Sequence, residues 1–110
     1  MQHRDKIIFE KVISEIEIAL EMMKGKSKHE FLENEMLKRA IGMTAINIGE
    51  LIKNVTPEMR AEHPEIPWKA VAGMRDITAH KYGTLRMEEV FDTVVHDFPA
   101  LKDALQKIQA

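Results

Sequence analysis

Residues 27–55 read SKHEFLENEMLKRAIGMTAINIGELIKNV and predict a long amphipathic helix. Ser27 and Glu30 have the Ser-x-x-Glu spacing of a capping box, in which each side chain accepts a hydrogen bond from the backbone N–H of the other residue. Apolar residues then recur at three- and four-residue steps as far as Val55, which is the period of one helix face. The helix is therefore expected to begin after Ser27 and to run to about Asn54.

Small residues on this helix predict close contact with another helix. Gly42, Ala45 and Gly49 follow one another at three- and four-residue steps, so they share a face. Each glycine inside a helix costs roughly 1 kcal/mol relative to alanine. We expect the close approach of a second helix to be the reason for this cost.

The segments on either side of this helix read as further helices with short connections. A first amphipathic helix is expected over about residues 4–24, with Gly25 at the position just past its end. Thr56 and Pro57 have the order of an N-cap followed by proline at the first helical position. They predict a short helix that stops before Pro64.

The C-terminal half of the chain continues the pattern. A third long helix is expected over residues 68–82, and it ends against Gly83. Thr84 can cap a fourth helix, which Pro99 breaks or restarts, and a last helix closes the chain. Short connections between long helices favour antiparallel packing. The sequence thus predicts an all-α fold, an antiparallel bundle of four to five helices in one domain, residues 1–110.

Composition excludes several classes of protein. The chain has 45% hydrophobic and 31% charged residues, the profile of a folded protein, and no cysteine for disulfides or thiolate metal sites. The five histidines are scattered and no Glu-x-x-His pair occurs, so neither a metal nor another cofactor is expected. We see no export signal and no stretch that could cross a membrane, and we expect a cytoplasmic protein.

Charge gives only a local indication of an anionic ligand. The formal net charge is −2, so the chain as a whole is not basic as nucleic-acid-binding proteins usually are. Residues 69–86, however, carry four positive charges against one negative charge. Any contact with nucleic acid is therefore expected in this window.

Arg75 and His80 in this window are candidate catalytic residues. On an ideal helix they lie about 7.5 Å apart along the axis and flank a floor of short side chains. Arginine offers a planar fork to phosphate oxygens, and histidine transfers protons near neutral pH. RNA suits this pair because its 2′-hydroxyl is an internal nucleophile, so the site needs no cofactor. One helix supplies half a cleft, which a second copy would complete.

Purely structural roles are the alternative for the same residues. Arg75 could pair with a carboxylate, and His80 could help to close the end of its helix. Tyr82 alone would more often be an aromatic residue at the edge of the core. Trp68 would be a core residue or an anchor of a dimer.

Residues 75–82, RDITAHKY, resemble the Arg-x-x-x-x-His-x-Tyr signature of HepT-like proteins, a branch of the HEPN superfamily. The resemblance extends to Pro67-Trp68 before the motif, to Gly73-Met74 leading into it and to the segment DFPAL at residues 97–101. The two long N-terminal helices also fit, so the resemblance spans nearly the whole chain.

The resemblance implies a metal-independent endoribonuclease toxin that acts as a homodimer, with Arg75 and His80 as catalytic residues and 2′,3′-cyclic phosphate as the expected product. Asp76 occupies a supporting polar position that is more often asparagine in these families. The implied partner is a minimal nucleotidyltransferase antitoxin, which would attach AMP to Tyr82 and so block RNA. A non-catalytic HEPN module that binds and regulates a nucleotidyltransferase remains the alternative.

Overall fold

The computed structural model describes residues 1–76 and 86–109, and every regular element in these ranges is helical. The all-α prediction is therefore confirmed for the part of the chain that the structure describes. The elements in chain order are α1 (His3–Met23), α2 (Lys28–Glu33), α3 (Glu35–Ile52), α4 (Pro57–Glu62), α5 (Trp68–Ala72), the 3-10 turn η1 (Gly73–Asp76), α6 (Arg86–Asp92), the π-helical turn η3 (Thr93–Asp97) and α7 (Phe98–Gln109).

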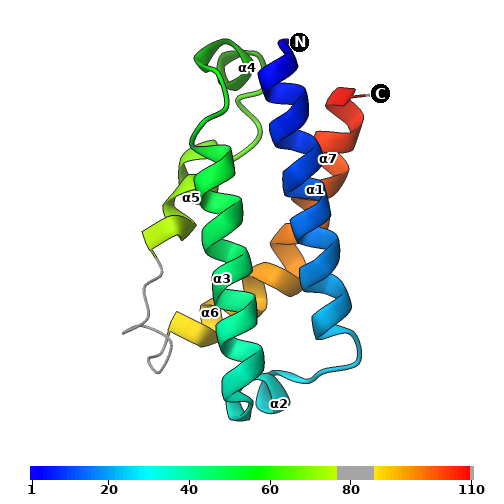
Figure 1. Ribbon diagram of the computed structural model, residues 1–110, viewed down its shortest axis with the longest axis vertical. Coiled ribbons are helices and arrows are strands. Elements are labelled where there is room, and N and C mark those ends of the chain that lie inside the picture. Colours follow the sequence, from blue (N-terminus) through cyan, green and yellow to red (C-terminus); the bar gives the residue numbers. More distant parts are fainter. Residues whose placement is uncertain (77–85, 110) are drawn as a thin grey trace.

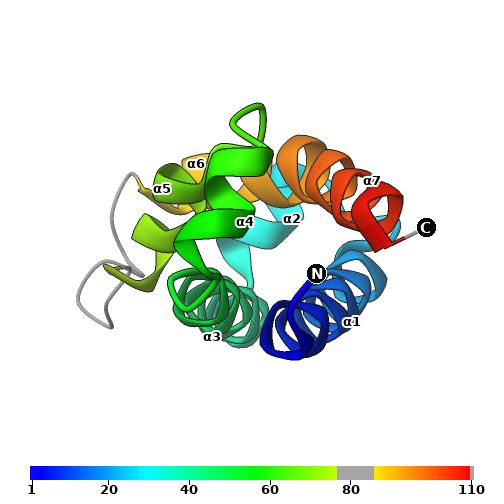
Figure 2. The same cartoon turned by 90° about the horizontal axis from the view of Figure 1, so that it is seen from above.

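The long helices α1, α3 and α7 stand side by side and form the body of the bundle (Figure 1). Helix α1 runs antiparallel to both of the others (Figure 1), and α5 packs on a different side of α3 from α1, as the end-on view in Figure 2 shows. The core between them is apolar. Its fully buried large side chains include Phe9, Val12, Ile16, Phe31, Ile41, Ile48, Ile52, Val94, Phe98 and Leu105.

The predicted helix over residues 28–54 is divided in two at Asn34. The capping box is present as expected, because Glu30 N–H donates to Ser27 Oγ at 3.1 Å and Ser27 N–H donates to Glu30 Oε1 at 3.0 Å. The Ser27 N–H, which donates to the Glu30 carboxylate, and after it the nearby Ser27 hydroxyl hold the pKa of the Glu30 carboxyl below its ordinary value. Asn34 then caps a new helix, since its Oδ1 accepts a hydrogen bond from Leu37 N–H at 3.0 Å. The expectation of one continuous helix was wrong for this reason.

Buried polar contacts tie the far end of α3 to the N-terminus. Asp5 is 1% exposed and accepts hydrogen bonds from the N–H of Thr56 at 2.9 Å and from its hydroxyl at 2.6 Å. Thr56 also caps α4 as predicted, by accepting from Met59 N–H. Arg60 donates to the carbonyls of Ile52 and Lys53, which would otherwise lack partners at the helix end. The C-terminal turn of α3 is thereby fixed in place.

The C-terminal half keeps a helical course through Pro99. Helix α6 passes directly into η3 and η3 into α7 at Phe98, so the chain stays helical through Pro99, which lies just after the π-helical turn. Lys28 Nζ lies 3.0 Å from Asp92 Oδ1, and the centroids of the Phe31 and Phe91 rings are 5.7 Å apart, so these contacts hold α6 against α2.

Among the described helices, none is long and apolar enough to span a membrane.

Candidate functional site around Arg75

Arg75 lies in η1, directly after the short helix α5. Trp68 fixes the start of α5, because its ring is 6% exposed, stacks on Phe9 at 6.1 Å and donates from Nε1 to the His63 carbonyl at 2.9 Å. Trp68 is thus a core residue, one of the two roles predicted for it. The α-helix ends at Ala72 and the chain tightens into the 3-10 turn at Gly73.

This change of helix type corrects the prediction of one long helix over residues 68–82. A 3-10 helix has three residues per turn and rises about 2.0 Å per residue, against 3.6 residues and 1.5 Å in an α-helix. The ideal α-helix is therefore left before Arg75, whereas the position of His80 relative to Arg75 falls on residues outside the described ranges and remains a prediction. Glycine at position 73 is a weak helix former, which is consistent with the α-helix ending there.

Gly49 of α3 allows the backbone of η1 to approach closely. A Cβ atom built on Gly49 would lie 2.5 Å from Arg75 N, 3.0 Å from the Ala72 carbonyl oxygen and 3.2 Å from Met74 C. All three are backbone atoms, so no side chain could rotate away to make room. The predicted close approach is confirmed at Gly49, where the packing partner is the segment that carries Arg75.

The Arg75 guanidinium is paired but remains accessible. Its Nη1 lies 3.7 Å from Glu50 Oε1, and the side chains of Arg75 and Glu50 are 44% and 48% exposed. The other oxygen of the same carboxylate, Oε2, lies 3.4 Å from Lys53 Nζ. The carboxylate pairing expected of a structural arginine is therefore present, together with the exposure that an anion-binding arginine requires.

The remaining predicted site residues lie at the edge of the described structure or outside it. Asp76 is the last residue of η1, and its backbone is described. His80 and Tyr82 fall within residues 77–85, outside the described residues. Their catalytic and modification roles, and the supporting role of Asp76, remain predictions. In the ranges that are described, no three His, Asp or Glu side chains cluster as a metal site would require.

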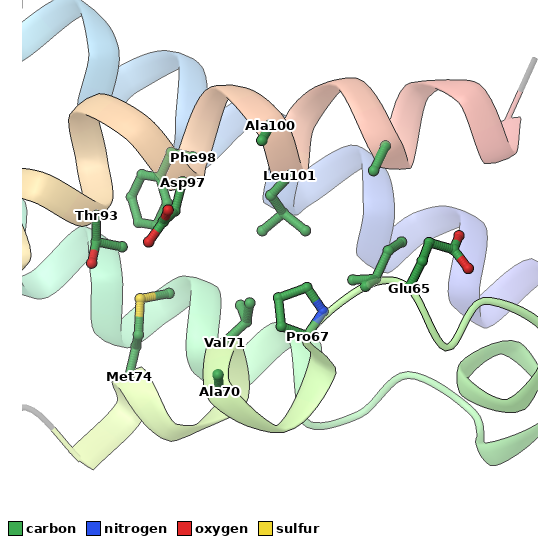
Figure 3. A pocket seen from close by; sticks show the side chains of 12 residues that line it. Glu65, Pro67, Ala70, Val71, Met74, Thr93, Asp97, Phe98, Ala100 and Leu101 are labelled. Carbon is green, nitrogen blue, oxygen red and sulfur yellow. The ribbon is translucent and has the colours of Figure 1, made fainter.

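An apolar pocket of about 360 Å³ lies between α5–η1 and α7. Figure 3 shows Pro67, Val71 and Met74 on one wall, with Phe98 and Leu101 on the other. Met74 lines this pocket and directly precedes Arg75. The turn η1 therefore borders the pocket through Met74 and contacts the α3 backbone through Arg75. The charged side chains that line it, Glu65 and Asp97, are acidic, so among the described residues the pocket offers no cation to bind a phosphate.

The comparisons with known proteins agree on one family. The model of the family described as "Ribonuclease HepT-like" matches residues 12–108. A "Putative RNase" of Caldanaerobacter subterraneus is 33% identical over 99 residues, which cover 90% of this chain and 88% of the relative. A "Probable ribonuclease HepT" of Thermococcus cleftensis is 30% identical over 109 residues, which cover 99% of each chain. No solved structure matches the chain.

Proposed function

Since the chain belongs to the HepT-like ribonuclease family, we propose that it is a metal-independent endoribonuclease, the toxin of a cytoplasmic toxin–antitoxin pair. The main support is the family match, which covers the whole motif of Arg75, His80 and Tyr82. In addition, Arg75 is half exposed and lies on a turn that packs against α3. An exposed guanidinium on a rigid support is suited to binding a phosphodiester.

The proposed chemistry uses the RNA itself as nucleophile. The 2′-oxygen attacks the adjacent phosphorus, its proton passes to a base, and the bond to the 5′-oxygen of the next nucleotide breaks as that oxygen gains a proton. Arg75 would stabilise the charge on the phosphate oxygens, and His80 would transfer protons. The products are a 2′,3′-cyclic phosphate and a free 5′-hydroxyl, and no cofactor takes part.

A second copy of the chain is proposed to complete the site. Met36 and Met43 on α3 are 83% and 54% exposed. They stand seven residues apart, as do Met43 and Glu50, so all three share one face of the helix. Exposed apolar side chains on one face favour a protein interface. A homodimer formed through this face would bring Arg75, which contacts Glu50, close to the interface between the two copies.

Silencing would act at Tyr82, two residues after His80. A minimal nucleotidyltransferase antitoxin is the proposed partner, and it would transfer AMP to the tyrosine hydroxyl. The added phosphate carries negative charge close to the motif arginine in sequence, and the nucleotide adds bulk. Both effects would exclude RNA from the site.

The test is cleavage of a mixed RNA pool in EDTA by the wild type, Arg75→Ala and His80→Ala at equal folded concentration. Mass spectrometry must first confirm an unmodified Tyr82. We expect cyclic-phosphate ends that both substitutions abolish. Intact RNA with the unmodified wild type would instead favour the non-catalytic module that binds a nucleotidyltransferase, for which the Arg75–Glu50 pair would be a structural contact.

A further inference from the structure

We propose that Glu50 is a positioning residue for Arg75: it holds the guanidinium beside α3 in the orientation in which it meets the RNA phosphate. This inference rests on the proposed ribonuclease function and adds a residue outside the 75–82 motif. Glu50 lies 25 positions before Arg75 in the sequence, and the fold brings their side chains to 3.7 Å.

The backbone contact at Gly49 sets the register of this pair. Arg75 N lies where a side chain at position 49 would begin, so the α3 backbone and η1 touch without any atom between them. Glu50 is the next residue on α3, a helix whose C-terminal turn is held by Arg60 and by the Asp5–Thr56 contact. The backbone of Glu50 therefore stands on a fixed support next to the backbone of Arg75, and only its side chain must reach the guanidinium.

The geometry leaves the guanidinium free to bind a second anion. At 3.7 Å the separation of Nη1 and Oε1 is an ion-pair distance and longer than a direct hydrogen bond. Arginine has five N–H donors, so donors remain for phosphate oxygens. Lys53 shares the carboxylate through Oε2, and the three side chains together carry a net charge of +1. The cluster thus still attracts an anion.

The Glu50–Arg75 contact is not expected to contribute much to the stability of the fold. In the single chain both side chains are close to half exposed, where water and salt screen an ion pair and reduce its contribution to folding. A free arginine side chain samples many rotamers, and ordering it beforehand lowers the entropic cost of aligning it with the transition state. The expected effect of Glu50 is therefore on turnover.

The positioning role of Glu50 is tested by measuring steady-state cleavage of a short RNA by the dimeric protein. Glu50→Gln is the test variant and Glu33→Gln is the control. The control removes the same charge from an exposed helix end on α2. For Glu50→Gln we expect kcat to fall by about twofold to fivefold, the most that an exposed ion pair can contribute to ordering the arginine. KM should stay the same or fall, because the site loses a negative charge that repels RNA. Glu50→Asp should restore part of kcat, and Glu33→Gln should behave as the wild type.

A second readout does not depend on activity. The side-chain ¹⁵N–Hε resonance of Arg75 should shift and sharpen in Glu50→Gln while the core amide resonances stay in place. If the wild type cleaves RNA and Glu50→Gln keeps both kcat and the Arg75 resonance, the proposal is wrong. A loss of melting temperature that accounts for the lost rate would also overturn it. If the wild type cleaves no RNA, the proposed function fails, and the resonance alone still decides whether Glu50 orders Arg75.

Discussion

Replacing Gly49 with alanine is expected to reduce cleavage by more than its effect on stability explains. The new Cβ would lie 2.5 Å from Arg75 N, whereas ordinary contacts begin at about 3.4 Å, so η1 must move by roughly 0.9 Å. Overpacking of this kind costs roughly 1–3 kcal/mol, and alanine returns about 1 kcal/mol of helix propensity. The net loss of folding free energy should be roughly 0–2 kcal/mol, while a 1 Å displacement of a catalytic group costs about 100-fold in rate.

Gly73→Ala provides the matched control for this prediction. A Cβ at Gly73 meets no atom of residues 1–76 or 86–109 within 4 Å outside its own helical turn, and the backbone there has helical angles, φ −65° and ψ −16°. Urea denaturation measures the stability of both variants, and cleavage at equal folded concentration measures their activity. We expect Gly73→Ala to cleave as the wild type does. The reasoning is refuted if Gly49→Ala retains full activity, or if its lost activity merely follows a large loss of stability.

Three further changes test the scaffold and the proposed interface. Asp5→Asn places an amide where two donors of Thr56 converge, and urea denaturation should show a loss of about 1–3 kcal/mol; an unchanged midpoint would contradict the buried contact. Ser27 lowers the pKa of Glu30, so the stabilisation from this carboxylate is complete above its unfolded value of 4.5 and is lost as the pH falls below that value. Glu30→Gln should therefore flatten the melting-temperature curve from about pH 6 to about pH 3, and an unaltered curve would argue against the cap. Met43→Lys puts a charge on the exposed face of α3 and should shift sedimentation towards the monomer; a dimer of unchanged affinity would place the interface elsewhere.

The sequence predicted most of the helices because their signals are local. Capping at Ser27 and Thr56 and the apolar periodicity of α1 and α3 depend only on neighbouring residues. The break at Asn34 was missed although asparagine is a good N-cap, because the apolar period continues across it. The change at Gly73 was missed for a different reason: η1 packs on the backbone of α3, and that contact joins residues far apart in the chain.

The candidate site was predictable only in part. Gly49 stood out because a glycine inside a helix needs a reason, and the reason was close packing. Glu50 gave no such signal, since an acidic residue on an exposed helix face is common and its contact with Arg75 appears only in the folded chain. Arg75 was identified from its motif, and its partner was identified from the structure.

The surroundings of η1 differ in stiffness from one side to the other. Backbone contact at Gly49 prevents any inward motion of Arg75, whereas the apolar pocket beside Met74 offers unfilled volume. Motion of the turn is therefore restricted in direction. A displacement caused by heat or pressure can carry Arg75 away from α3 but not towards it. The asymmetry thus defines one limiting position of the arginine, the position in which its backbone meets that of Gly49.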